Sequence, residues 1–343
     1  MKELTYVRAT DAAEAVAAVS ADEHARFLGG GTNLVDHLKL GVATPTTLVD
    51  VSRLATDEIE QVDGPVGPVL RIGAGVPNSD LAAHPLVRSR WPVVARSLLA
   101  GASAQIRHQA TTGGNLLQRT RCVYFQDVTT PCHKREPGSG CSALEGYGRY
   151  NAVLGASADC VAVHPSDLAV GLTAVDAVVV VLGSDGERRV PISELHRLPG
   201  AHPERDTTLA HGELVTAVEL PLLDLTRRST YVKTRDRASY AFALVSVAAA
   251  VELAEDGTLT DLRIAWGGIA HKPWRAEVAE AALRSRVPTE DLVRQAVDEE
   301  LRDARTGPDN AYKVPMVRNA TALALRDLTR DLAGDPTSTG GAP

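Results

Sequence analysis

Aromatic side chains are scarce in this 343-residue chain, which contains 3 Phe, 3 Trp and 7 Tyr. The net charge is −7, which disfavours binding to the negatively charged backbone of nucleic acids. The few aromatic side chains also offer little surface on which bases could stack. No apolar run approaches the roughly 20 residues of a membrane-spanning helix. The first ten residues contain no apolar signal segment. We therefore expect no nucleic-acid partner, no membrane span and no export signal on this chain.

Cysteine is absent from most of the chain. The four cysteines all lie between residues 122 and 160, at Cys122, Cys132, Cys141 and Cys160. Two disulfides would require an oxidising compartment. A structural zinc site usually has paired C-x₂₋₄-C knuckles, which are missing here. A 4Fe-4S cluster requires only that four thiolates converge in space. The residues alone favour a metal centre and leave iron–sulfur and zinc open.

Positive charge gathers in and directly before the same window, at Arg121, Lys134 and Arg135. Cationic groups stabilise thiolates and offset the charge of an anionic cluster. The window therefore has a composition suited to a metal centre bound by thiolates.

Two glycine-rich segments share one chemistry: Gly29-Gly-Gly-Thr-Asn33 and Thr111-Thr-Gly-Gly-Asn115. Glycine allows positive φ and removes Cβ atoms, so successive backbone N–H groups can converge on an anion. Two such segments suit a pyrophosphate, which has oxygens on both sides. Neither matches a dinucleotide G-x-G-x-x-G or a Walker A motif. The spacing therefore does not name the nucleotide, and ordinary tight turns are the alternative.

The order of the expected elements indicates an α+β protein with a boundary near residue 223. Before it, short helices and strands are mixed, including one expected helix over residues 86–100. After it, strands over residues 231–233, 241–253 and 259–266 precede helices over 274–283, 289–301 and 312–332. Strands followed by helices are typical of a separate α+β domain. Residues 333–343 are rich in Gly, Pro, Ser and Thr, and we expect them to form a disordered tail.

Several segments together identify a family. They are Phe27–Leu34, Gln105–Arg107, Thr111–Cys122 with Tyr124-Phe125, Pro131–Cys141, His164–Leu168, Lys233–Tyr240 and Gly267–Trp274. With these residues the chain resembles the FAD-binding medium subunit of molybdenum hydroxylases, the family of xanthine dehydrogenase and carbon monoxide dehydrogenase. It is most similar to the branch of bacterial aldehyde oxidoreductases whose flavin subunit carries an additional 4Fe-4S cluster. One position departs from the family pattern. The family segment reads Tyr-Phe-Arg, whereas this chain has Tyr124-Phe125-Gln126.

The resemblance implies a fold in two parts. A PCMH/VAO-like FAD-binding domain would cover residues 1–222, as two subdomains of about 1–55 and 56–222. A cluster-binding insertion would occupy about residues 119–160. An α+β domain with an antiparallel sheet and helices would follow over residues 223–332.

The resemblance also implies the site residues. The FAD pyrophosphate would be held on one side by Phe27, Leu28, Gly29, Gly30, Gly31, Thr32, Asn33 and Leu34. On its other side would lie Thr111, Thr112, Gly113, Gly114 and Asn115. Asp167 would accept hydrogen bonds from the ribose or adenine end, and Lys233 would lie near the flavin ring. Leu214 and Val215 would pack on the isoalloxazine or the adenine, and Cys122, Cys132, Cys141 and Cys160 would bind the cluster.

Simpler roles remain open for single residues, and no catalytic residue is assigned. Asp167 could be only a helix N-cap, and Lys233 only a solvated strand residue. Leu214 and Val215 could be plain core residues.

The function implied by the resemblance is electron transfer. A molybdopterin-binding large subunit would oxidise an aldehyde, a 2Fe-2S small subunit would pass the electrons on, and the FAD here would deliver them to a terminal acceptor. The complex would be cytoplasmic, or periplasmic by co-export with a signal-bearing partner. One alternative is a stand-alone flavin oxidase or reductase of the same superfamily. A second is a non-enzymatic metal-cluster interaction protein.

Overall fold

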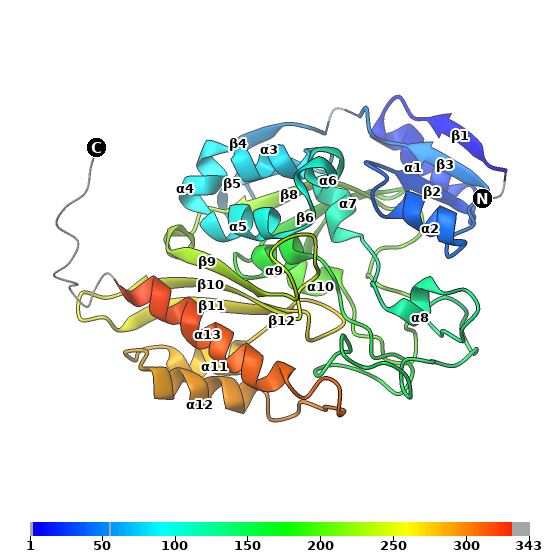
Figure 1. Ribbon diagram of the computed structural model, residues 1–343. Helices are drawn as coiled ribbons and strands as arrows, with labels where there is room; N and C mark the ends of the chain where they lie inside the picture. The colour runs from blue at the N-terminus through cyan, green and yellow to red at the C-terminus, as the bar shows by residue number, and fades with distance from the viewer. Residues whose placement is uncertain (1–2, 55, 331–343) are drawn as a thin grey trace.

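The N-terminal part of the chain forms a small parallel sheet. The computed structural model describes residues 3–54 and 56–330, and the expected disordered tail lies outside them. The sheet has the order β1-β3-β2, from β1 (Thr5–Arg8), β2 (Ala25–Leu28) and β3 (Thr47–Asp50), with helices α1 (Ala12–Ser20) and α2 (Leu34–Leu40). Figure 1 shows this unit at one end of the molecule, around the N-terminus. Parallel strands require helical crossovers, which α1 and α2 provide.

A second, antiparallel sheet forms the body of the first domain. Its order is β4-β5-β8-β6-β7, from β4 (Ile59–Gly64), β5 (Gly67–Gly73), β6 (Val178–Gly183), β7 (Gly186–Pro191) and β8 (Leu214–Pro221). The associated helices are α3 (Asn78–Ala83), α4 (Pro85–Arg90), α5 (Pro92–Ala100), α6 (Ala104–Gln109), α7 (Thr112–Leu116), α9 (Asp167–Thr173) and α10 (Ile192–Leu195).

The single helix expected over residues 86–100 is wrong. The chain forms α4 and α5 instead, with Trp91 between them and Pro92 at the first position of α5. Proline lacks an N–H and its ring clashes with the carbonyl four residues before it, so it begins a new helix here.

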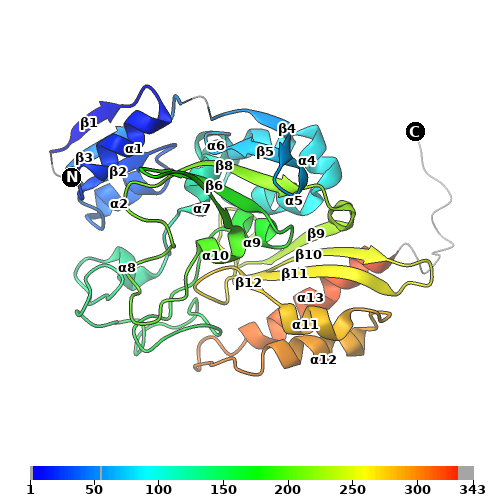
Figure 2. The ribbon, with the colours of Figure 1, turned by 180° about the vertical axis from the view of Figure 1, so that it is seen from behind.

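The cysteine segment, residues 119–160, is almost free of regular structure. It contains the short helix α8 (Val123–Gln126) and an isolated bridge between Cys132 and Cys141. Figure 2, which shows the molecule from behind, places the segment as a set of loops beside α8. Its ends return to the body of the protein through backbone hydrogen bonds of Val153 and Leu154 to Ile269.

The C-terminal part forms an antiparallel sheet with helices, and the expected α+β class is confirmed. The sheet order is β12-β11-β10-β9, from β9 (Ser229–Thr234), β10 (Val245–Leu253), β11 (Leu259–Gly267) and β12 (Trp274–Arg275). Helices α11 (Glu277–Leu283), α12 (Glu290–Glu300) and α13 (Lys313–Thr329) follow, and a 3₁₀ turn, η1 (Asp224–Arg227), precedes the sheet. The helix expected from residue 274 begins later because Trp274 and Arg275 pair with β11 as an edge strand.

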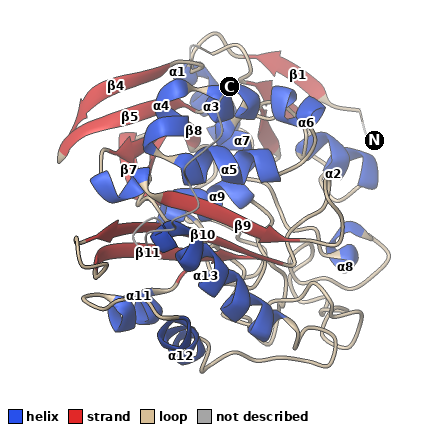
Figure 3. Ribbon diagram, turned by 60° about the vertical axis from the view of Figure 1, so that its left-hand side comes forward, coloured by secondary structure: helices blue, strands red, loops and turns tan. Residues whose placement is uncertain are grey.

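Both faces of this last sheet are covered. Helix α13 packs on one face, and α5 and α9 of the first domain pack on the other (Figure 3). Tyr231, Ala248 and Ala265 of the C-terminal sheet belong to the same buried cluster as Val170 of α9. The two domains therefore share a hydrophobic core. Within the described residues, no helix has the length and apolar character that crossing a membrane requires.

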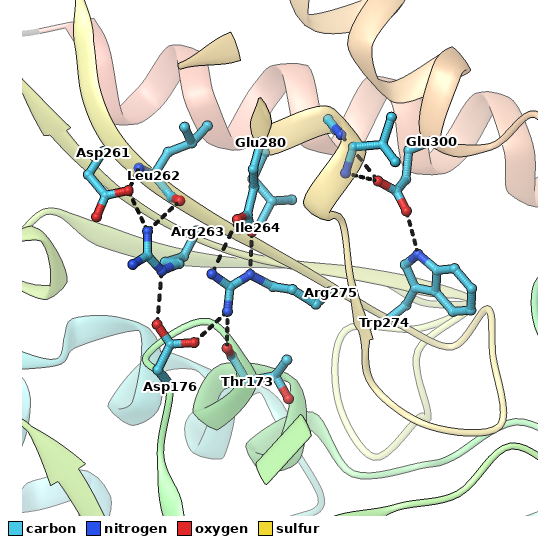
Figure 4. Close-up of polar contacts among 12 residues, drawn as sticks. Thr173, Asp176, Asp261, Leu262, Arg263, Ile264, Trp274, Arg275, Glu280 and Glu300 are labelled. Carbon is cyan, nitrogen blue, oxygen red and sulfur yellow. Dashed lines mark hydrogen bonds and ion pairs between the residues drawn. The ribbon is translucent and has the colours of Figure 1, made fainter. Parts of the chain in front are cut away.

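Ion pairs reinforce this domain contact (Figure 4). Asp176, which follows α9, receives Arg263 Nε at 2.9 Å and Arg275 Nη1 at 2.6 Å, both from the C-terminal sheet. Arg275 also donates to the Thr173 carbonyl and pairs with Glu280 of α11. These contacts fix the angle between the domains, and a site at their junction is preorganised.

Candidate cofactor site

The two glycine segments face each other across a narrow gap. A Cβ atom on Gly30 would lie 1.9 Å from the carbonyl oxygen of Gln109, just before the second segment. The Gln109 side chain donates from Nε2 to the Gly30 carbonyl at 3.1 Å. The Arg119 backbone N–H donates to Asn33 Oδ1 at 3.0 Å. Only glycine permits this approach at position 30.

The first segment is a turn, whereas the second is largely helical. Gly31 has φ of 74°, in the left-handed region, and α2 begins at Leu34. Residues 112–116 form α7, whose N-cap Thr111 accepts a hydrogen bond from the Gly114 N–H. The second segment is therefore not a tight turn like the first, because its threonine caps a helical turn.

A cavity of about 580 Å³ lies between the small parallel sheet and the second sheet. Of the residues that the resemblance assigns to FAD, its wall contains Phe27, Gly29–Leu34, Thr111, Gly113, Gly114, Leu214 and Val215. Leu214 and Val215 are also buried, each in a different cluster of the hydrophobic core, so both residues serve the core as well as the cavity wall.

A second cavity of about 590 Å³ adjoins the first, and both walls include Thr32, Asn33 and Gly114. It lies at the junction of the two domains, and its wall contains Asn115, Asp167 and Lys233. The glycine segments therefore stand where the two cavities meet, which is where the middle of an elongated ligand would lie. Such a division suits a dinucleotide with a central pyrophosphate.

Two assigned residues lie elsewhere. Leu28 and Thr112 are in neither cavity wall. Thr112 is fully buried, and its hydroxyl donates to the Val76 carbonyl at 2.9 Å. These two residues shape the backbone of the segments and do not face the cavities.

Asp167 and Lys233 meet in the wall of the second cavity, so they lie at the same end of a ligand there and not, as expected, at its adenine and flavin ends. Asp167 is the first residue of α9, and the N-cap is Ser166, so Asp167 is not the cap. Lys233 Nζ donates to Asp167 Oδ2 at 2.7 Å and to the Ala100 carbonyl at 3.1 Å. Tyr231, which the sequence did not single out, donates to Asp167 Oδ1 at 2.6 Å. Burial and the adjacent Asp167 carboxylate raise the pKa of Tyr231 well above its usual value, so the phenol keeps its proton.

The second cavity is also lined by buried polar atoms that have no hydrogen-bond partner among the described residues. They are Asn78 Oδ1, Arg121 Nε, His164 Nε2 and Ser246 Oγ. Buried polar atoms are almost always hydrogen-bonded, so unpartnered ones around a cavity indicate a polar ligand there. The glycine cradle and these atoms together fit FAD. Sequence reasoning assigned none of the four to FAD, although Arg121 and His164 lie in segments that carry the family resemblance.

The four cysteines come together in space. Cys122, Cys132, Cys141 and Cys160 all line one cavity of about 10 Å³, and none forms a disulfide. Burial raises the pKa of the Cys160 thiol to about 11 and also raises those of Cys122 and Cys141. In the part of the chain that the structure describes, no three or more His, Cys, Asp or Glu side chains are placed to hold a metal ion.

Backbone N–H groups point at the sulfur atoms. Cys122 receives those of Tyr124 and Phe125, and Cys160 receives that of Ala162. Cys141 receives three, from Ala143, Leu144 and Val161. Hydrogen bonds to sulfur favour the thiolate form, which is the form that binds metals. The donor set and its surroundings therefore fit a thiolate-bound group.

The second cavity and the cysteine-lined cavity share a wall. Thr120, Cys122 and Ala162 line both the second cavity and the cysteine-lined cavity. A group held by the cysteines would therefore lie next to a ligand in the second cavity.

Comparison with known proteins also indicates an FAD-binding protein. Residues 2–223 match the FAD-binding domain in molybdopterin dehydrogenase, and residues 230–328 match the CO dehydrogenase flavoprotein C-terminal domain. The chain is 47% identical to the aldehyde oxidoreductase FAD-binding subunit PaoB of Escherichia coli over 329 residues, 95% of this chain and 98% of that protein. It is 28% identical to the glyceraldehyde dehydrogenase medium chain of Sulfolobus acidocaldarius, over 85% of each chain.

Solved structures share the fold. Carbon monoxide dehydrogenase from Hydrogenophaga pseudoflava matches with a TM-score of 0.74 at 23% identity, over 96% of this chain and 98% of that chain. Quinoline 2-oxidoreductase from Pseudomonas putida matches with a TM-score of 0.73 at 20% identity, over 97% of this chain and 100% of that chain. The chain therefore belongs to the family of FAD-binding medium subunits of molybdenum hydroxylases.

Proposed function

We propose that this chain is the electron-transfer subunit of a molybdenum-dependent aldehyde oxidoreductase complex and that it binds FAD and a 4Fe-4S cluster. The observation that carries the proposal is the pair of facing glycine segments where two cavities meet, in a chain 47% identical to an aldehyde oxidoreductase FAD-binding subunit. The proposed partners are a molybdopterin-binding large subunit and a 2Fe-2S small subunit.

FAD, when bound, exchanges electrons singly or in pairs and so couples one-electron centres to a terminal acceptor. The protein supplies position and polarity. The backbone of Gly29–Asn33 and of Thr111–Asn115 would hold the pyrophosphate. Leu214 and Val215 offer apolar contact in the first cavity. Lys233 and Asp167 form an ion pair in the wall of the second cavity, where each keeps hydrogen-bonding capacity for a bound ligand.

The cysteine segment would hold the cluster. Support comes from the shared cavity of the four cysteines and from the backbone N–H groups aimed at three of the sulfur atoms. A cluster holds its thiolates at separate iron atoms, so the ligands stand farther apart than around one ion. Among the described residues no three potential ligands are placed around a single ion, which suits a cluster better than zinc.

A visible spectrum of the purified full chain, with assays of released flavin, iron and acid-labile sulfide, tests the proposal. We expect one FAD and four iron and four sulfide per chain. Absence of FAD would refute the flavoprotein assignment and favour a metal-binding interaction protein. FAD with zinc and no iron would leave the flavin site intact and refute the cluster.

A second measurement separates a subunit from a stand-alone enzyme. The chain alone should not oxidise aldehydes, and activity should appear only in the complex with the molybdopterin-binding partner. Turnover of a small substrate by the isolated chain would instead favour a self-contained flavin oxidase or reductase.

A further inference from the structure

A buried lysine lies in the wall of the cysteine-lined cavity. Lys134 follows Cys132 by two positions, and its side chain is 1% exposed. Its Nζ donates to the Pro203 carbonyl at 2.7 Å, to the carboxylate of Asp206, and to His271 Nε2 at 2.8 Å. An ammonium group has three hydrogens, and all three have acceptors here. The charged form of Lys134 is therefore fully hydrogen-bonded.

The charges around Lys134 do not cancel. Asp206 also accepts from Arg119 Nε at 2.6 Å, so two cations share one carboxylate. Burial favours the neutral acid, but Arg119 and Lys134 outweigh it and hold the pKa of Asp206 well below its usual value. Asp206 is thus ionised, and the three side chains carry a net charge of about +1.

The histidine in this group adds no charge. His271 Nε2 accepts from Lys134, so its proton is on Nδ1, which faces the Ala162 carbonyl at 3.1 Å. Burial and the charge of Lys134 lower the pKa of His271 to about 4. Burial, together with His196, also lowers the pKa of neighbouring His164, so that imidazole is neutral as well.

The positive charge lies beside the thiols. Lys134 lines the cavity together with all four cysteines, and its charge acts on Cys160 in the direction that favours the thiolate. The Ala162 N–H points at Cys160, while the Ala162 carbonyl accepts from His271. Little solvent screens a charge at this depth, so its effect on a neighbouring anion is larger than at the surface.

We propose that Lys134, held in place by Asp206 and His271, is a positioning residue that raises the reduction potential of the group bound by the four cysteines, an inference that rests on the cluster proposed above. Reduction adds one electron to the cluster, with no bond made or broken at the protein. A buried cation beside the thiolates stabilises the added negative charge. Asp206 opposes this effect and sets its size.

The test is a redox titration of the full chain, purified with the subunits that accompany it and followed by electron paramagnetic resonance of the cluster. In Lys134→Met, the ratio of reduced to oxidised cluster at a fixed potential should fall about tenfold, a shift of about 59 mV for one electron. Asp206→Asn removes the opposing charge, so its ratio should rise. Lys134→Arg keeps the charge and should restore most of the ratio.

The matched control is Lys272→Met. Lys272 follows His271 directly, but its Nζ reaches the Ser193 carbonyl at the surface. Lys272→Met also removes one positive charge, but from the solvent side of the protein. The ratio of reduced to oxidised cluster should therefore not change.

The sign separates this proposal from a purely structural role. Opposite shifts in Lys134→Met and Asp206→Asn, each with full iron content, support it. Shifts of the ratio in the same direction in both variants overturn the proposal, and so does an unchanged ratio in Lys134→Met with full iron content. If Lys134→Met loses iron, Asp206→Asn decides: a raised ratio supports the proposal, and an unchanged or lowered ratio overturns it. A wild-type chain without iron and sulfide would instead refute the cluster itself.

Discussion

Lys233 and Asp167 form an ion pair across the domain junction, with Nζ 2.7 Å from Oδ2. Lys233 lies on β9 of the C-terminal sheet, and Asp167 begins α9 of the first domain. Their side chains are 3% and 9% exposed, and both line the second cavity. A ligand in that cavity therefore contacts both domains at once, so cofactor binding and domain docking are linked.

Lys233→Met should lower both stability and FAD content. Removing one partner of a buried ion pair leaves the other charge uncompensated, which costs about 3–5 kcal/mol. Tyr231 would still donate to Asp167, so the lower end of this range is expected. Thermal unfolding and flavin content per chain measure the two effects. Exposed Lys39 gives the control, and an equal loss in Lys39→Met would contradict the explanation.

Gly30→Ala should abolish FAD binding, whereas the same substitution at a glycine far from the cavities should leave FAD binding intact. The new Cβ would lie 1.9 Å from the Gln109 carbonyl oxygen, so the two glycine segments would have to separate. Flavin content after purification is the measurement. Gly307→Ala is the control, because its Cβ would meet only Asn310 Oδ1 at 3.9 Å. A Gly30→Ala protein with full flavin content would show that the close approach is not needed.

The sequence predicted what depends on local patterns. Glycines at 29–31 predicted a backbone that can take positive φ, as Gly31 does, and the order of strands followed by helices predicted the α+β class. The partners of these segments could not be predicted. Asp206 reaches the cysteine segment from 72 positions beyond Lys134, and unpartnered Ser246 becomes notable only once the cavity around it is known. Such contacts depend on tertiary packing, which leaves no local spacing to recognise.

The ion pairs between the domains predict a selective loss of stability. Arg275 contacts Asp176, Thr173 and Glu280, and Glu280 is 6% exposed. Arg275→Met would leave Glu280 with the Ile264 N–H as its remaining donor, at a cost of roughly 3 kcal/mol. The melting temperature should fall by several degrees. Arg294→Met breaks an exposed pair on α12 and should change stability by no more than about 0.5 kcal/mol.

Buried neutral histidines should make the protein sensitive to acid. Burial lowers the pKa of His196 and of His271 to about 4, from about 6.5. Between these pH values the unfolded chain binds more protons than the folded one. Stability is therefore highest above about pH 6.5 and falls as the pH drops toward 4, by about 3 kcal/mol for each histidine.

His196→Gln tests this dependence. His196 Nε2 donates to the Leu116 carbonyl at 2.8 Å, and a glutamine amide can make the same bond without titrating. The difference between melting temperatures at pH 7.5 and pH 5 should be smaller in His196→Gln than in the wild-type chain. In His24→Gln, which changes an exposed histidine, the difference should stay as it was. If His196→Gln keeps the full acid sensitivity, protonation of His196 is not one of its causes, and the loss of stability must come from other groups.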